Sequence, residues 1–88
     1  MIIKLENTES VQTFPIIASV ENPTILVLET NRDIDVDIDD EDFRGDLVIT
    51  EKREIESGYE ITVKFIKINK DVEITPDSVQ GQLHIKLK

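Results

Sequence analysis

The sequence predicts an all-β fold, a two-sheet sandwich of about seven or eight strands in a single domain over residues 1–88. Alternation of apolar and polar residues recurs through most of the 88-residue chain, whereas no stretch shows the three- and four-residue apolar spacing of a helix. Turn-forming residues separate the candidate strands at roughly ten-residue intervals, as in sandwiches. Ile, Val and Leu dominate the 39% of residues that are hydrophobic, which suits a core of branched side chains.

The first two candidate strands are expected at sheet edges. Residues 2–6 predict a short edge strand within an N-terminal arm of residues 1–10. Residues 11–20 contain Pro15, which has no N–H to donate to a central ladder, so this strand should be at an edge or broken. An edge strand can add to the sheet of a neighbour, and the apolar residues of the arm are therefore predicted to bind a partner. They are Ile2, Ile3 and Leu5.

Residues 24–30 predict a central strand, because the middle of this stretch is continuously apolar between the turn formers Asn22-Pro23 and Asn31. A strand of this kind is expected to be covered on both faces. Residues 47–50 predict a short strand of the same type.

Residues 33–39 alternate strictly, with aspartate at the odd positions and Ile or Val at the even ones. One face of this strand should pack on the core, and the other is a row of carboxylates. The row consists of Asp33, Asp35, Asp37 and Asp39.

The second half of the chain supplies the remaining strands. Residues 82–88 alternate with their apolar side chains at odd positions, and residues 59–65 do the same. After residue 65 the apolar phase shifts to Ile66 and Ile68, which indicates a bulge or a crossing between sheets. A short strand near residues 72–75 completes the set.

The composition argues against several classes of protein. Nineteen acidic and ten basic residues give a net charge of −9, which repels nucleic-acid phosphates and anionic lipids, so neither is an expected partner. No cysteine is available for a disulfide or a thiolate nucleophile. The first residues lack the apolar core of a signal peptide, and no later apolar run would span a membrane. The expected location is the cytoplasm or a virus particle.

Residues that could support catalysis are scarce. His84 is the single histidine and is expected on the exposed face of its strand, so it has no second imidazole with which to form a zinc site. Only three glycines are present, and they form no phosphate-binding loop. The sequence therefore predicts a protein that is not an enzyme and has no cofactor.

Residues 29–46 concentrate the charge, with nine carboxylates and two arginines for a net of −7. One interpretation is calcium binding by oxygen ligands, although an EF-hand loop would need glycine where this chain has Asp40. A second is a solvated face that deters edge-to-edge aggregation. The third is that the carboxylate row docks on a basic partner surface. The calcium candidates are Asp35, Asp37, Asp39, Asp40 and Asp42.

The same region contains Arg44-Gly45-Asp46, the tripeptide that integrins recognise. Glycine between two charged residues is equally what an ordinary turn between strands would use, so the tripeptide has two interpretations.

Two resemblances add to these inferences. Residues 24–36, 59–65 and 81–87 resemble the strand rhythm of immunoglobulin-like modules of the BACON and major-sperm-protein-like type. That resemblance implies an adhesive or structural unit, such as an auxiliary or decoration protein of phage capsids and tails. Residues 33–50, a loop over 51–59, and the later strands also resemble the α-crystallin domain of small heat-shock proteins, which implies a chaperone. Both resemblances imply a sandwich.

The function expected from the sequence is that of a non-enzymatic structural or interaction protein. Its most specific form is an auxiliary protein of a virus particle, either decorating it or associated with its capsid or tail. The partners would be other proteins of the assembly, with self-association as a further candidate interaction. The alternative is a small heat-shock-like chaperone.

Overall fold

The chain folds into eight strands and two four-stranded sheets that pack as a sandwich, which confirms the predicted fold class. The structure is a computed structural model and describes residues 2–5, 10–39, 41, 43, 48–77 and 79–88. Within these residues there is no helix. The strands are β1 Ile2–Leu5, β2 Gln12–Ala18, β3 Thr24–Thr30, β4 Asp35–Ile38, β5 Val48–Ile55, β6 Gly58–Phe65, β7 Ile68–Asp77 and β8 Gln82–Leu87.

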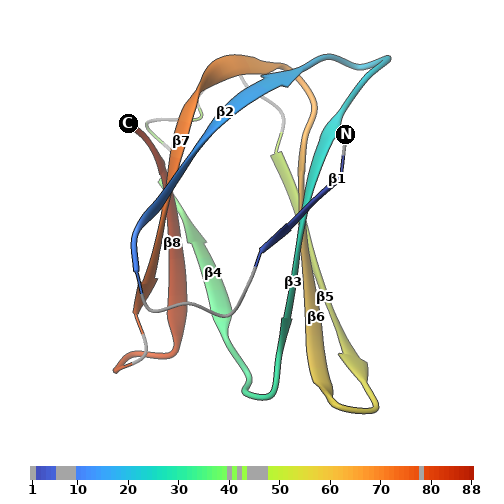
Figure 1. Cartoon of the computed structure of the whole chain (residues 1–88), viewed down its shortest axis with the longest axis vertical. Helices are drawn as coiled ribbons and strands as arrows, with labels where there is room; N and C mark the ends of the chain where they lie inside the picture. The colour runs from blue at the N-terminus through green and yellow to red at the C-terminus, as the bar shows by residue number, and fades with distance from the viewer. Residues whose placement is uncertain (1, 6–9, 40, 42, 44–47, 78) are drawn as a thin grey trace.

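Sheet A has the strand order β1-β3-β6-β5, and sheet B has the order β2-β7-β8-β4. Figure 1 shows the two layers nearly edge-on, with β3, β5 and β6 on the right and β7 and β8 on the left. Two outer pairs, β1 with β3 and β4 with β8, are parallel, whereas the other pairs are antiparallel. One strand lies between β1 and β3 along the chain, and three strands lie between β4 and β8. With an odd number of strands between them, the two strands of each pair run in the same direction. An immunoglobulin sandwich has two antiparallel sheets, and these parallel pairs depart from it.

The edge positions predicted for the N-terminal strands are confirmed, since β1 ends sheet A and β2 ends sheet B. Pro15 lies in the middle of β2, opposite Asp71 of β7. Because β2 has a neighbour on only one side, the missing N–H of Pro15 can face away from the ladder.

The core lies between the sheets and is built mainly from alternate residues of every strand except β5. In β3, Leu26 and Leu28 are buried, while Ile25 and Val27 on the opposite face are only half-buried. The central position predicted for this strand is therefore confirmed, but the predicted cover on both faces is wrong. Among the described residues, sheet A has a second layer on one side only.

The shift in the apolar alternation after residue 65 corresponds to a crossing between the sheets. Of the two predicted alternatives, a bulge or a crossing, the structure has the crossing. Phe65 ends β6 in sheet A, and Ile68 begins β7 in sheet B. Both side chains are buried in the shared core, so the two residues between them turn the chain from one layer to the other.

β5 differs most from its prediction. A short central strand was expected over residues 47–50, but β5 has eight residues and forms the edge of sheet A. Its residues from Ile49 to Glu54 are all exposed. The segment 51–59, which the α-crystallin resemblance treats as a loop, is instead a hairpin in which only Glu56 and Ser57 form the turn. An edge strand with two exposed faces has no apolar alternation by which it could be recognised.

β7 is also longer than expected, with ten residues in place of the predicted 72–75. Its first half pairs with the edge strand β2 and is exposed from Asn69 to Asp71. Polar residues at these positions hide the strand pattern in the sequence.

Candidate functional site

The most strongly charged surface among the described residues is the side of sheet B that faces away from the core, which we term the acidic face. Val72 and Ile74 of β7 and Leu83 and Ile85 of β8 point into the core. Since side chains alternate along a strand, the residues between them point outward. The acidic face comprises Thr13, Pro15, Ile17, Asp35, Asp37, Asn69, Asp71, Glu73, Thr75, Asp77, Gln82, His84 and Lys86.

This face contains five carboxylates and one lysine, a net charge of −4 with histidine neutral. Two of the carboxylates, Asp35 and Asp37, belong to the row predicted from the sequence. The other three, Asp71, Glu73 and Asp77, come from β7, more than thirty residues later in the chain. The sequence did not predict that these three carboxylates share a surface with Asp35 and Asp37. They do so only because β8 pairs with both β4 and β7.

His84 lies between carboxylates from two strands. Its Nδ1 is 2.9 Å from Oδ2 of Asp37 on β4, and its Nε2 is 3.6 Å from Oδ2 of Asp77 on β7. With its proton on Nδ1, the ring donates a hydrogen bond to Asp37. His84 is on the predicted face of its strand but is half-buried between these neighbours, and it lines a hollow of about 300 Å³.

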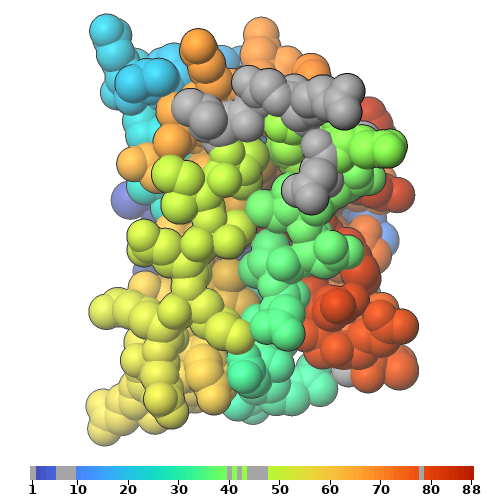
Figure 2. Space-filling view, turned by 180° about the vertical axis from the view of Figure 1, so that it is seen from behind, coloured from blue at the N-terminus to red at the C-terminus, as the bar shows by residue number. Residues whose placement is uncertain are grey.

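Lys52 on β5 connects the two sheets on the side where β4 and β5 run next to each other (Figure 2). Its Nζ donates to Oδ1 of Asp33 at 2.5 Å and to Oδ1 of Asp35 at 3.1 Å, and it lies 5.9 Å from the centre of the Tyr59 ring. The hydrogen bond to Asp33, followed by the one to Asp35, raises the pKa of Lys52 above its ordinary value of 10.5. Part of the predicted carboxylate row is therefore ion-paired within the chain.

The raised pKa of Lys52 predicts a stability effect at alkaline pH. A group whose pKa is higher in the folded state stabilises that state fully below its unfolded pKa, near 10.5, and loses this effect as the pH rises through the folded pKa. The melting temperature of the wild type should therefore exceed that of Lys52→Gln from neutral pH up to about pH 10, with the gap closing above it. Thermal denaturation followed by circular dichroism measures this gap.

Lys70→Gln is the control for this prediction, since it removes an exposed lysine on β7. The difference in melting temperature between Lys70→Gln and the wild type should change less over the same pH range than the difference for Lys52→Gln. A gap for Lys52→Gln that stays constant above pH 11, while the protein is still folded, would contradict the assigned role of Lys52.

The remaining predicted site residues are placed as follows. Asp39 accepts a hydrogen bond from the backbone N–H of Glu41 at 3.0 Å, which organises the turn after β4. In the N-terminal arm, Leu5 is buried in the core and Ile3 packs against it, while Ile2 is 67% exposed. Residues 2–5 of the arm are thus part of its own sheet A, and Ile2 is the outward-facing apolar residue among them.

Two of the calcium candidates, Asp40 and Asp42, lie outside the described residues, as does Arg44-Gly45-Asp46. In the part of the chain that the structure describes, no group of three or more carboxylate or imidazole side chains is placed to hold a metal ion.

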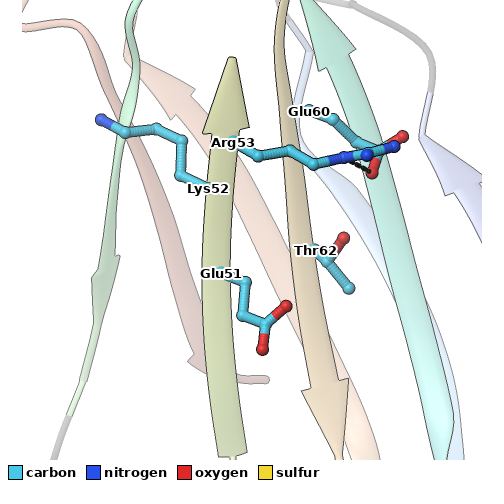
Figure 3. Close-up of a pocket in the computed structure, with 5 residues that line it drawn as sticks. All are labelled: Glu51, Lys52, Arg53, Glu60 and Thr62. Atoms are coloured by element: carbon cyan, nitrogen blue, oxygen red, sulfur yellow. Dashed lines mark hydrogen bonds and ion pairs between the residues drawn. The ribbon is translucent and has the colours of Figure 1, made fainter. Parts of the chain in front are cut away.

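The opposite surface of the sandwich, the outer side of sheet A, has a different character, and we term it the neutral face. It contains three cationic side chains, Lys4, Arg53 and Lys64, and three carboxylates, Glu29, Glu51 and Glu60. Arg53 reaches across β6, and its Nε donates to Oε1 of Glu60 at 2.9 Å (Figure 3). Figure 3 also shows that Lys52 leaves the opposite side of β5, toward sheet B. A hollow of about 550 Å³ lies over this part of β5 and β6.

No protein-family model, curated protein or solved structure matches the chain. None of the described segments is a helix that could cross a membrane.

The chemistry of the site therefore rests on its charges. The acidic face offers exposed carboxylate oxygens from β4 and β7, which accept hydrogen bonds from lysine and arginine. It has a hollow of about 300 Å³ beside His84, and it differs by four charges from the neutral face on the other side of the molecule.

Proposed function

We propose that this protein is a non-enzymatic interaction protein of a larger assembly, and that its acidic face docks on a basic surface of a partner. The observation that carries this proposal is the unequal distribution of charge, with −4 on the acidic face and zero on the neutral face. Such an asymmetry gives the molecule one preferred orientation toward a basic partner and speeds their encounter.

The carboxylates of the acidic face are available to a partner even where they are paired within the chain. Asp35 and Asp37 are exposed although they contact Lys52 and His84. Exposed ion pairs contribute only about 0–1 kcal/mol, so a lysine or arginine of a partner can replace an internal one at little cost. A sheet face with such groups suits a basic protein surface.

The specific form that we propose is an auxiliary protein of a virus particle, either a decoration protein or one associated with the capsid or tail. This rests on the resemblance of residues 24–36, 59–65 and 81–87 to immunoglobulin-like modules and on the sandwich that both share. A small protein attached through one charged face could decorate a regular surface without altering its own fold.

The test is cofractionation of the protein with a large particle from its natural source, at several salt concentrations. We expect the wild type to sediment with the particle at low salt and to be released at higher salt, because salt screens contacts between charged surfaces. Asp71→Lys, which reverses one exposed charge on the acidic face, should shift the protein to the free pool at a lower salt concentration.

Glu21→Lys is the matched control, because Glu21 is exposed in the turn between β2 and β3 and the substitution changes the net charge equally. This variant should cofractionate much like the wild type. A wild type found only in the free pool would contradict the proposal. Large oligomers of the protein alone that suppress the aggregation of other proteins would favour a small heat-shock-like chaperone instead.

A further inference from the structure

We infer that the neutral face binds a second copy of this chain, so that two molecules form a weak two-fold dimer with sheet A packed on sheet A. This inference is independent of the proposed partner on the acidic face, since it uses the opposite surface of the sandwich.

The neutral face is the most apolar sheet surface that the described residues leave uncovered. Ile25 and Val27 lie half-buried in its middle, on the central strand β3. Ile2 on one edge strand and Ile49 on the other are 67% and 46% exposed. An apolar surface of this kind, rimmed by charged side chains, is typical of a protein–protein contact.

Charge determines which face two copies can use to approach each other. Molecules of net charge −9 repel one another, and two acidic faces of −4 each would repel most strongly. The neutral face carries no net charge, so two copies can approach each other through it without this local repulsion.

The strand register makes the two edge strands of the neutral face, β1 and β5, complementary to each other across a two-fold axis. Across β1, β3, β6 and β5, one row reads Ile2, Ile25, Lys64 and Ile49, and the next reads Lys4, Val27, Thr62 and Glu51. A two-fold axis parallel to the strands places β1 of each copy over β5 of the other. Ile2 then meets Ile49 of the second copy, and Lys4 meets Glu51 of the second copy. Each contact occurs twice, as a two-fold interface requires.

These charges cannot satisfy each other within one molecule. Lys4 and Glu51 are three strand spacings apart, or about 14 Å, which is too far for an ion pair. The third row of the face places Glu29 opposite Glu60 of the second copy, but Arg53 lies 2.9 Å from Glu60 in the same chain and reduces that repulsion.

The size of the face places the dimer among small interfaces. Four strands at ~4.8 Å spacing and about 25 Å of strand length cover roughly 450 Å² of each copy. The total of about 900 Å² is below the ~1,200 Å² of standard stable interfaces and belongs to the weak class. We expect a Kd on the order of 100 µM.

The test is sedimentation velocity from about 5 µM to 1 mM protein, with Lys4→Glu and Glu51→Lys as variants. The wild type should be monomeric at the low end and mostly dimeric at the high end. Each variant places two pairs of like charges in the dimer. Its Kd for dimerisation should therefore be about ten times that of the wild type or more. An equimolar mixture of the two variants should dimerise again, because both charged contacts then join opposite charges. Native mass spectrometry identifies this mixed dimer.

The two variants also separate a specific contact from the effect of total charge. Lys4→Glu makes the net charge more negative and Glu51→Lys makes it less negative, so an effect of total charge alone would weaken one dimer and strengthen the other. Lys86→Glu on the acidic face changes the total charge as Lys4→Glu does and should leave the contact between neutral faces in place.

Four results would overturn the inference. The first is a wild type that stays monomeric at 1 mM, and the second is a dimer of Glu51→Lys that is stronger than the wild-type dimer. The third is an equimolar mixture of Lys4→Glu and Glu51→Lys that fails to dimerise. The fourth is a loss of dimer affinity for Lys86→Glu equal to that for Lys4→Glu. Melting curves of each variant show that the exposed substitutions leave the fold intact. Asp71→Lys, the variant that tests the partner on the acidic face, should dimerise like the wild type, so the two proposals can fail separately.

Discussion

Replacing Phe65 by alanine is expected to lower the free energy of unfolding by about 3–5 kcal/mol. Phe65 is 0% exposed and lies at the end of β6, between Thr24 of β3 and Val48 of β5. Its ring centre is 6.0 Å from that of Phe43. Removing a buried phenylalanine side chain costs about 3–5 kcal/mol, because apolar contacts are lost and a cavity remains. A domain of this length has a total stability of about 4–13 kcal/mol, so the loss is a large fraction of it.

Urea denaturation followed by circular dichroism measures the effect on the free energy of unfolding. Phe65→Leu should retain enough packing to stay folded and to give a measurable loss of about 1–2 kcal/mol. Ile17→Ala is the control, since Ile17 is 75% exposed on β2 and should cost at most about 0.5 kcal/mol. A loss for Phe65→Ala as small as that of the control would mean that the two sheets do not share the core described above.

The second large effect is expected at Gly58, which opens β6 after the hairpin turn. Its φ of +143° is one that side-chain-bearing residues rarely adopt, and a Cβ there would lie 2.2 Å from the carbonyl oxygen of Thr30. That atom belongs to the backbone of β3 and cannot move without disturbing the pairing of β3 with β6. Gly58→Ala should therefore destabilise the protein by about 3 kcal/mol or more.

Gly81 provides the matched comparison. Its φ is +66°, but the nearest atom to a Cβ would be the carbonyl oxygen of Asp33 at an ordinary contact distance of 3.7 Å. Gly81→Ala should lower the free energy of unfolding by about 1–2 kcal/mol, which is the penalty of a positive φ for a residue with a Cβ. Gly81→Asn should lower it by less, because asparagine adopts a positive φ more readily than alanine does. Equal losses for Gly58→Ala and Gly81→Ala in the same urea experiment would rule out the close approach to Thr30 as the cause.

Strands with one buried face could be predicted from the sequence, because their apolar side chains recur at every second position. The last strand is such a case, with Leu83 and Ile85 buried and His84 on the other face. The crossing after Phe65 was also visible, because a change of sheet changes the parity of the buried residues. Only the start of β5 was predicted, within residues 47–50, since the rest of this charged edge strand has no buried face.

The acidic face shows a second limit of sequence analysis. The carboxylate row on β4 was visible as an alternating pattern, but its neighbours on the surface depend on the register of the sheet. Asp77 approaches His84 because β7 and β8 pair with a specific alignment, and Lys52 reaches Asp33 because β5 and β4 end their sheets on the same side. Such contacts between distant parts of the chain leave no local signal.

The parallel pairing of β4 with β8 affects when this surface can form during synthesis. Asp35 and its pairing partner Gln82 are 47 residues apart, and closing so long a loop is slow compared with forming the β5–β6 hairpin. A growing chain on the ribosome therefore has β4 but no strand to pair with it until residues 82–87 have been made. The acidic face is completed only when residues 82–87 have been made, because β8 joins the carboxylates of β4 to those of β7.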